Sequence, residues 1–515
     1  MYDVVISGGG PVGIGLAIEL GQRGIHTAIV DRNETPPRIP KGQNLTQRTM
    51  EHMRAWGVED DIRAAKTIPR GVGLGGVTAY GTLLGGYHYD WFKRAAVGQY
   101  YSAENERLPQ YATEAVLRKR ASAIDAIEPI YSWKSTDIDS DGCAVRISRD
   151  GQSRLLEGRI LVGCDGSRSL VRNAAGITET QHDHDRTMVL VVFESPELFE
   201  LLARFPDKQF YNVLDPELDG YWKFFGMVDW GKSFFFHAPV PPDTNRDSFD
   251  FKSLIHSAVG ADFPLNLDYV GFWDLRISQA DSYQSGSVFI AGDAAHSHPP
   301  YGGYGVNTGF EDARNLGWKI AATLQGWGGP GLLDSYSAER HPVFASTAKD
   351  FIEKFIADDR AFLRANDPKN GKLEFEAAWA ARAQSSEVQG IATFAPHYGG
   401  SPIVIGAAED APSAVGRHEF VAIAGHHLSP QPLGDGTTLD CLGRGFTAFL
   451  SDFVAAELRE AADARGIPLD IIEVPKEVAD AHGHKAVLVR PDGYVAWVGS
   501  DLEDAGAVID KAAGY

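Results

Sequence analysis

The chain has 515 residues, too many for a single small hydrophobic core, so we expect two to three domains. Its formal net charge of −21 argues against nucleic acid and anionic membranes as partners, because both require a basic surface. No apolar run of about 18 residues is present and the N-terminus lacks a basic segment, so we predict neither a membrane span nor a signal peptide. Three widely spaced cysteines favour a reducing cytoplasm and predict no disulfide and no metal site.

The N-terminal segment has the pattern of a dinucleotide-binding βαβ unit, with apolar strands at 4–6 and 27–30 around an apolar helix. The loop before that helix contains Gly8, Gly9, Gly10, Pro11, Val12 and Gly13. In such a loop Gly8 forms the turn, Gly10 lets a pyrophosphate approach, and Gly13 lets helix and strand touch. Asp31 is placed to accept the ribose hydroxyls of an adenosine, and the other predicted cofactor contacts here are Arg32 and, in the loop, Pro11 and Val12. The unit predicts a dinucleotide but does not choose between NAD and FAD.

The segment 181–275 alternates strand-like runs with turn signals, which predicts an antiparallel sheet. It is rich in aromatic side chains, most of which we expect in the core of that sheet. Because side chains alternate between the two faces of a strand, only every second residue can face a cofactor. We predict Trp222 and Phe224 as one such pair, with Tyr211 as a third pocket residue. His237 is a candidate base for the substrate.

The stretch 288–319 runs from a short apolar strand into Gly292 and Asp293, then through a loop rich in proline and glycine into a helix. Glycines in the loop let backbone amides approach a flat cofactor, and the helix directs its positive end at the same place. If Asp31 holds the adenosine ribose, a second acid must hold the ribityl chain of a flavin, and Asp293 is the natural candidate. NAD has no ribityl chain, so this stretch favours FAD.

Three separated signatures resemble those of class A FAD-dependent aromatic monooxygenases, the phenol hydroxylase and para-hydroxybenzoate hydroxylase group. They are the glycine loop at 8–13, the run CDGSRS at 164–169 with Arg172, and the run GDAAH at 292–296. The resemblance extends over residues 1–350. It implies an α/β fold with a Rossmann-type FAD-binding domain formed by 1–180 and 276–355, and an inserted, mostly antiparallel substrate-binding sheet at 181–275 with part of 70–100.

The C-terminal third divides into two parts. Residues 356–395 are charged and rich in alanine, which predicts a helical connector. Residues 396–515 resemble the thioredoxin-like α/β domain of the phenol hydroxylase branch. Cys441 stands there without a C-x-x-C partner, so we expect dimer contact or stabilisation and no redox role.

The resemblance also implies roles for single residues around the cofactor. Gln110 matches a glutamine on the flavin side, and Lys41 stands where many relatives have an arginine near the FAD phosphates. Asp165 belongs to a shared FAD/NAD(P)H motif, where it mainly stabilises the loop near the pyrophosphate together with Arg172. Asn44 matches a position near the flavin–substrate junction, where it could hydrogen-bond a phenol but could not serve as its base.

The flavin ring is expected against the loop and the first helical turn after it. Free amides of that turn supply positive potential near N1 and the C2 oxygen of an anionic reduced flavin. The expected contacts are Pro300, Gly303, Gly305, Val306 and Asn307. Tyr301 and Tyr304 stand where the family usually has alanine and glutamine, so they add bulk and hydroxyls beside the flavin and are candidate catalytic residues.

The implied activity is hydroxylation of a phenolic or related (hetero)aromatic substrate through a flavin C(4a)-hydroperoxide, with O2 and NAD(P)H as co-substrates. No second glycine motif is present, so NADH or NADPH is expected to bind transiently. Two alternatives stay open: hydroxylation with loss of a ring substituent, and a flavin-dependent oxidoreductase that hydroxylates no aromatic. A flavin halogenase is disfavoured because the chain has no W-x-W stretch.

Overall fold

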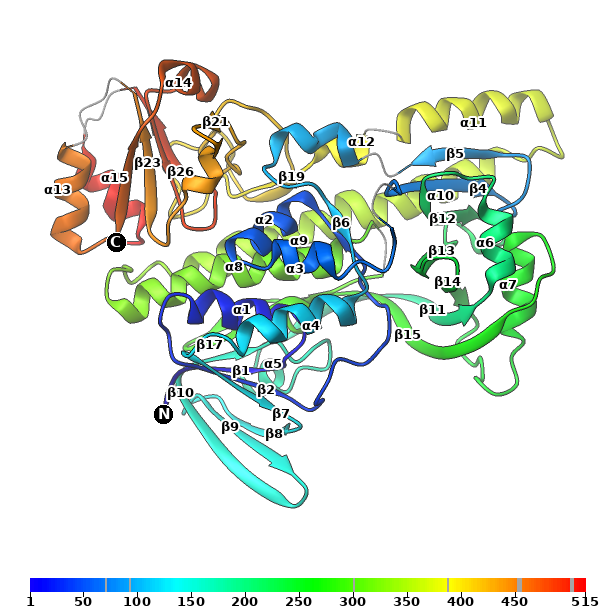
Figure 1. Cartoon of the computed structure of the whole chain (residues 1–515), viewed down its shortest axis with the longest axis horizontal. Coiled ribbons are helices and arrows are strands. Elements are labelled where there is room, and N and C mark those ends of the chain that lie inside the picture. The colour runs from blue at the N-terminus through cyan, green and yellow to red at the C-terminus, as the bar shows by residue number, and fades with distance from the viewer. Residues whose placement is uncertain (70–71, 92–93, 300–301, 387–388, 452–455, 501–503) are drawn as a thin grey trace.

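The computed structural model describes residues 1–69, 72–91, 94–299, 302–386, 389–451, 456–500 and 504–515. Within these residues the chain forms two eight-stranded sheets, one four-stranded sheet and three two-stranded sheets. Figure 1 shows the second large sheet and the C-terminal region at opposite ends of the long axis, with the long helix α8 running between them. None of the helices described is both long and apolar enough to cross a membrane.

The first sheet is built around β1 (Tyr2–Ser7), which pairs in parallel with β2 (Thr27–Asp31) and β10 (Gln152–Gly163). Val4, Val5 and Ile6 are fully buried, as expected for a parallel strand covered on both faces. The other strands of this sheet are β7 (Ile127–Tyr131), β8 (Lys134–Asp139), β9 (Ala144–Arg149), β16 (Gln284–Ser285) and β17 (Val288–Ile290).

Helix α1 (Pro11–Gly21) follows β1 and packs against α8 (Tyr304–Gln325) and α4 (Gln110–Ala121). A Cβ atom at Gly13 would lie 2.0 Å from the carbonyl oxygen of Gly8, so the helix can reach the strand this closely only with glycine there. The predicted βαβ unit is therefore present, with its glycine loop at the carboxyl end of β1.

The second sheet is mostly antiparallel, and only β12 and β4 pair in parallel. Its strands in spatial order are β18 (His296–Ser297), β15 (Asn266–Ala280), β11 (Glu179–Glu194), β14 (Ser233–Val240), β13 (Trp222–Asp229), β12 (Lys208–Leu214), β4 (Gly75–Tyr80) and β5 (His88–Trp91). Helices α6 (Pro196–Leu202) and α7 (Phe251–Val259) cover one face, where Phe225 and Phe236 are buried. The other face carries Phe210, Phe224 and Phe235, which pack with Ile39 from the first region.

Short elements connect the two sheets. Strand β3 (Asn44–Leu45) pairs with β6 (Glu106–Arg107), so the loop after β2 is held next to the start of α4. The others are α2 (Gln47–Ala55), α3 (Glu59–Ala64), η1 (Arg94–Tyr100), α5 (Leu170–Ala174) and η3 (Gly292–Ala294).

The chain then forms a series of helices and a smaller α/β region. The helices are α9 (Asp334–Ser346), the π-helical turn η4 (Thr347–Glu353), α10 (Lys354–Ala365), α11 (Lys372–Ser386) and α12 (Gln389–Thr393). In the C-terminal region, β23 (Phe446–Leu450) pairs in parallel with β24 (Leu469–Glu473) and antiparallel with β25 (Ala486–Val489), which pairs with β26 (Val495–Gly499). Its helices are α13 (Ala456–Arg465), α14 (Lys476–His482) and α15 (Ala505–Ala512).

Buried ion pairs join the C-terminal region to the helices of the first region. The Arg490 guanidinium lies 2.6 Å from Glu339 on α9, and Lys319 on α8 lies 2.7 Å from the same carboxylate. Asp492 binds the other side of Arg490 at 2.6 Å. All four side chains are almost completely shielded from solvent, so the interface between the regions contains a compensated charge cluster.

Candidate active site

The glycine loop leaves an open place for an anion at the start of α1. Gly8 has φ +108°, and a Cβ there would lie 2.2 Å from the carbonyl oxygen of Cys164. At Gly10 a Cβ would meet nothing within 4 Å, so this residue faces open space. No side chain caps the N-terminus of α1 and Pro11 occupies its first turn, which leaves backbone amides directed at that space.

Asp31 is fixed at the edge of this loop. Its Oδ2 accepts a hydrogen bond from the Gly9 amide at 3.0 Å, and Arg118 approaches its Oδ1 at 3.6 Å. Arg118 also donates to the carbonyl oxygen of Gly9 at 3.3 Å. The predicted ribose-binding acid therefore lies beside the predicted phosphate loop, while its neighbour Arg32 is exposed.

Asp293 lies in η3, directly after the strand β17. The residue is exposed to solvent, yet burial among protein atoms raises the pKa of Asp293, while His296 and Lys41 oppose that shift. Exposure combined with desolvation is typical of a carboxyl that lines a cleft. Lys41, itself exposed, is near enough to act on this carboxyl, so the two predicted cofactor residues share one cleft.

The first turn of α8 closes the cleft. Gly303 has φ +70° and precedes the helix, whose N-terminus no side chain caps. A Cβ at Gly42 would lie 3.1 Å from Val306, and the Gly42 amide donates to Gln110 Oε1 at 3.2 Å. Gln110 and Val306 thus meet at one loop, next to uncapped amides that can bind an anionic edge of a ring. Gly305 follows in the same turn.

Asn307 contacts other parts of the protein with all of its carboxamide. Its Oδ1 accepts from the Thr46 amide at 3.0 Å and from Thr49 Oγ1 at 2.6 Å. Its Nδ2 donates to the carbonyl oxygens of Asn44 at 2.9 Å and Gly303 at 2.6 Å. This side chain therefore positions the turn of α8 against β3. The Asn44 Nδ2 atom is buried without a partner among the described residues and lies beside Gly303.

Asp165 organises a loop next to the cleft. Its carboxylate accepts from the amides of Leu170 and Val171, at 2.8 and 3.2 Å, at the start of α5. Arg172 links this loop to η3 by donating to the carbonyl oxygen of Ala294 at 2.9 Å. These hydrogen bonds fix the loop at the start of α5 and hold it against η3.

The inward face of the second sheet forms an aromatic wall, which we define as Phe210, Trp222, Phe224, His237 and Trp273. Phe224 pairs across strands with His237, and its ring lies 5.2 Å from that of Trp222. The Trp273 ring lies 5.1 Å from His237. Trp222 and Phe224 thus share a face, as two residues at alternate positions must.

Tyr211 does not belong to this wall. It pairs with Phe225 on the opposite face of the sheet, which helices α6 and α7 cover, and its hydroxyl donates to the carbonyl oxygen of Lys208 at 2.9 Å. The prediction of Tyr211 as a pocket residue fails because Phe210 and Asn212, its neighbours along β12, occupy the inward face.

His237 is almost completely buried, and its Nδ1 atom has no partner among the described residues. Burial lowers the pKa of His237 to about 3, with a backbone hydrogen bond at Val189 opposing the shift. The ring is therefore neutral in the physiological range. A neutral imidazole with one unused nitrogen can accept or donate a hydrogen bond, but it is a weak base.

The structure describes only one of the two tyrosines predicted beside the flavin. Tyr301, like Pro300, lies outside the described residues. Tyr304 directs its ring at Phe394, 4.4 Å away, and Phe351, 5.9 Å away. It belongs to the same buried cluster as Trp222, so it closes the wall from the side of the connector helices.

Sequence reasoning missed the residue on which much of this geometry depends, Asp312 in the middle of α8. Its carboxylate accepts from the Gly292 amide at 3.0 Å, from His296 Nε2 at 2.7 Å and from Arg340 Nε at 2.8 Å. Although burial opposes it, His296 and Arg340 hold the pKa of Asp312 below its usual value. The only available signal was an acid within a predicted helix.

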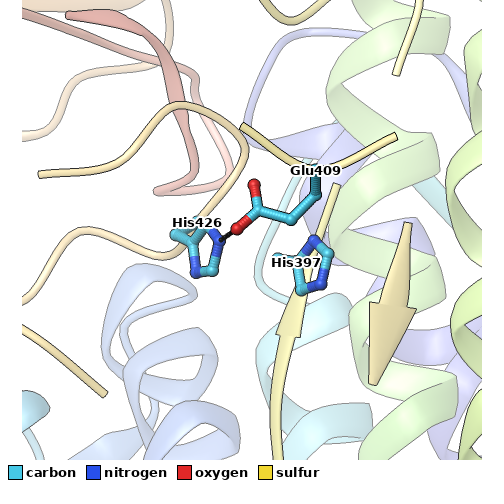
Figure 2. Close-up of side chains that lie close together, drawn as sticks. All are labelled: His397, Glu409 and His426. Atoms are coloured by element: carbon cyan, nitrogen blue, oxygen red, sulfur yellow. Dashed lines mark hydrogen bonds and ion pairs between the residues drawn. The ribbon is translucent and has the colours of Figure 1, made fainter. Parts of the chain in front are cut away.

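A second polar cluster lies away from the cleft, where the connector enters the C-terminal region. Figure 2 shows His397, Glu409 and His426 gathered there, with the Glu409 carboxylate 3.0 Å from His426 Nε2. His397 Nδ1 accepts from the Gly399 amide at 3.2 Å, and its ring also has a backbone hydrogen bond at Val415. Protein groups therefore already bond the ring nitrogens of His397. We interpret the cluster as a structural contact between β19 (Phe394–His397) and the loops that follow it.

The site combines a parallel sheet with a glycine loop, an acid beside that loop and an uncapped helix, which is typical of a flavin- or nucleotide-dependent oxidoreductase. Residues 1–350 match the family model described as an FAD binding domain, and residues 423–513 match the aromatic-ring hydroxylase C-terminal model. The chain belongs to the family of FAD-dependent aromatic-ring monooxygenases.

Individual relatives are similar over their full lengths. A 4-methyl-5-nitrocatechol 5-monooxygenase from Burkholderia sp is 31% identical, with 99% of this chain and 96% of the relative aligned. Among solved structures, the rebeccamycin biosynthetic enzyme RebC with reduced flavin has a TM-score of 0.83 and 28% identity, covering 100% of this chain and 99% of the other. Aklavinone-11 hydroxylase with FAD and aklavinone has a TM-score of 0.78 and 25% identity, with 100% and 99% coverage.

Proposed function

We propose that this enzyme uses NADH or NADPH and O2 to hydroxylate a phenolic or related (hetero)aromatic compound, with the ring held between the aromatic wall and the first turn of α8. The observation that carries the proposal is the position of the wall. Phe224, Trp273 and Ile39 pack in one cluster, so the wall meets the loop that follows the adenosine-binding strand. An aromatic ring placed there would lie beside the cofactor cleft.

The described residues around the cleft fit FAD. Gly10 and the start of α1 would bind the pyrophosphate, Asp31 the adenosine ribose and Asp293 the ribityl chain. Lys41 supplies positive charge near the phosphates, and Gln110 with Gly303, Gly305 and Val306 would border the ring. When bound, the flavin accepts a hydride from the nicotinamide and, once reduced, activates O2 for transfer of one oxygen atom to the aromatic ring.

The residues of the chain prepare this reaction in three ways. The uncapped amides of α8 stabilise negative charge on the reduced ring. The buried wall excludes water, which protects a reactive oxygen species from wasteful breakdown. His237 and Asn44 each have one unused polar atom with which to hydrogen-bond and orient a substrate hydroxyl. Because His237 is a weak base, we favour orientation by a hydrogen bond over full proton removal.

We further propose the domain roles that follow from this arrangement. Residues 1–180 and 276–355 form the FAD-binding domain, and 181–275 with part of 70–100 form the inserted substrate-binding domain. Residues 356–395 act as a connector that covers the wall, and 396–515 form a thioredoxin-like domain that supports the FAD-binding domain and a homodimer. The buried Arg490–Glu339 pair supports this stabilising role.

Hydroxylation with loss of a ring substituent is a second candidate. The name of the Burkholderia relative places oxygenation at the ring carbon that bears a nitro group. The similarity to that relative over almost the whole chain favours testing nitro-substituted phenols beside unsubstituted ones.

The proposal is tested with the purified holoenzyme. We expect a yellow protein whose oxidation of NADH or NADPH accelerates with a suitable phenol, and a product that gains one oxygen atom from labelled O2 by mass spectrometry. Released nitrite would identify substituent loss. A yellow protein that no phenol, catechol or hydroxypyridine stimulates would contradict the proposal and favour an oxidoreductase without aromatic hydroxylation.

A further inference from the structure

Arg107 is a buried cation at the boundary between the cofactor cleft and the aromatic wall. It lies on β6, directly across the strand pair from Asn44, and only 4% of its surface is exposed. Residues opposite each other on paired strands project to the same side. The side chain of Arg107 therefore extends from the same side of the strand pair as Asn44, which lies beside Gly303 at the start of α8.

All contacts recorded for the Arg107 guanidinium are with neutral groups. Nη1 donates to Gln209 Oε1 at 3.2 Å, Nη2 donates to Gln43 Oε1 at 2.5 Å, and the Phe210 ring centre lies 5.0 Å away. The buried Nε atom has no hydrogen-bond partner among the described residues. Among the described residues no carboxylate forms an ion pair with Arg107, and Asp229 acts on its charge only from a greater distance.

A buried cation without a counter-charge is unfavourable, and other buried arginines of this protein avoid that state. Arg340 pairs with Asp312, Arg490 with Glu339 and Arg23 with Glu19. At Arg107, burial lowers the pKa to about 9, while Tyr211 and Asp229 oppose that shift, so the guanidinium stays charged near neutral pH. A buried charge that has no ion-pair partner and lies beside the proposed binding site is explained if the ligand supplies the anion.

The surroundings fit a flat ligand. The Phe210 ring under the guanidinium stacks at 12° on Phe224, with 5.7 Å between ring centres, and Phe224 is followed along the wall by His237. The Asn212 Oδ1 atom, next along β12 on the inward face, is also buried without a partner among the described residues. Cation, aromatic surface and unused polar atoms thus lie along one path from Arg107 to His237.

We propose that Arg107 recognises an ionised group on the aromatic substrate, a carboxylate or an acidified phenolate, and so makes the enzyme selective for anionic aromatics. The planar guanidinium offers directed N–H donors that match such a group. This inference rests on the proposed function, since it names the substrate class of the same site. The competing anion is FAD itself, and the experiment separates the two.

The test compares the wild-type holoenzyme with Arg107→Met, which removes the charge, and Arg107→Lys, which keeps it. Lys223→Met is the matched control, because Lys223 is a buried cation of the same sheet that already pairs with Asp215 at 2.6 Å. Dissociation constants are measured from changes in flavin absorbance for two probe pairs, 4-hydroxybenzoate with 4-hydroxybenzamide and 4-nitrocatechol with catechol. FAD content and thermal midpoint are measured for each variant.

We expect wild type to bind the anionic member of at least one pair more tightly. Arg107→Met should weaken binding of that anion by about 10- to 100-fold and leave binding of its neutral partner unchanged. Arg107→Lys should restore part of the loss, and Lys223→Met should retain wild-type preference. In wild type the bound nitrocatechol should ionise at lower pH than in solution, a shift visible in its own absorbance that Arg107→Met abolishes.

Three results would overturn the inference: no preference for either anion in wild type, equal weakening of charged and neutral probes in Arg107→Met, or loss of FAD in that variant at an unchanged thermal midpoint. The last would assign Arg107 to the cofactor. If Arg107→Met does not fold, Arg107→Lys is compared with wild type instead. A Lys variant that shows the same preference for the anionic probe and the same ionisation of bound nitrocatechol as wild type would also contradict the role. Failure of the proposed function is distinct, since no aromatic would then stimulate NAD(P)H oxidation.

Discussion

Desolvation sets the charge of the side chains around the proposed site. Burial keeps His237 neutral by lowering its pKa to about 3, and it raises the pKa of Asp293. Arg107 loses part of its basicity for the same reason but stays charged near neutral pH. The wall thus has an uncharged hydrogen-bonding ring, that of His237, while the Arg107 cation lies next to Phe210.

The neutrality of His237 makes folding sensitive to acid. Its pKa is lower in the folded than in the unfolded chain, so the unfolded state binds more protons between about pH 6.5 and 3, and stability falls as pH decreases through that window. The slope approaches about 1.4 kcal/mol per pH unit for one proton. His237→Gln should therefore flatten the dependence of the thermal midpoint on pH between 6.5 and 4.5. An exposed control, His26→Gln, should not, and an unchanged slope in His237→Gln would contradict the assignment.

Asp293 should be required for cofactor retention. Asp293→Ala removes the carboxyl proposed for the ribityl hydroxyls, and losing hydrogen bonds to a charged group should weaken FAD binding by about tenfold or more. The ratio of flavin to protein absorbance after gel filtration measures this, with the exposed Asp262→Ala as control. Full flavin occupancy in dilute Asp293→Ala would exclude the contact.

At the scale of elements, α8 connects the parts of the site. Its first turn borders the cleft, Asn307 fixes it to β3, and Asp312 ties it to η3 and α9. The apolar pattern of the sequence predicted this helix correctly, because such a pattern depends on neighbours in sequence. Asp312 and Arg107 could not be found that way, since their partners lie tens of residues away and only the folded chain brings them together.

The alternation of side chains between the two faces of a strand shows the same limit of prediction from sequence. Trp222 and Phe224 could be grouped from sequence because they are two residues apart on one strand. Whether Tyr211 shares their face depends on how β12 registers against β13, and the pairing of Tyr211 with Phe225 decides against it. A register shift at the start of β12 is not visible in the sequence.

Removing the Asp312 carboxylate, which holds Gly292, His296 and Arg340 together, should loosen η3. Asp312→Asn leaves the buried Arg340 without its carboxylate, which typically costs about 3 to 5 kcal/mol, and frees the turn that carries Asp293. We expect a lower denaturation midpoint together with weaker FAD binding. The exposed Asp334→Asn serves as control. A variant that loses stability but retains full FAD affinity would show that this carboxylate does not position the turn.

At the scale of the whole molecule, the resemblance predicted an FAD-binding region within residues 1–350, and the FAD binding domain model matches those residues. The contact between the C-terminal region and α9 was not predictable, since neither Glu339 nor Arg490 stands in a recognisable motif. Their buried pair nonetheless joins the two regions.

Glu339→Gln should weaken the attachment of the C-terminal region to α8 and α9. It leaves Lys319 and Arg490 buried with Asp492 as the remaining acid of the cluster, so we expect a thermal midpoint several degrees lower and faster amide exchange within 486–499. Surface variant Glu376→Gln is the control. If exchange in that segment stays at the wild-type rate, the cluster does not couple the regions.

The position of β17 and η3 late in the chain has a consequence for biosynthesis. β10 gains its second parallel neighbour only when residues 288–290 arrive, and the carboxyl of Asp293 follows immediately. A nascent chain that has emerged only as far as the second sheet already contains the half proposed to bind adenosine, but it exposes one edge of β10 and lacks the acid proposed for the ribityl chain. We therefore expect flavin loading to be a late event in synthesis, and we expect chains released before that point to be captured by chaperones before they can bind the cofactor.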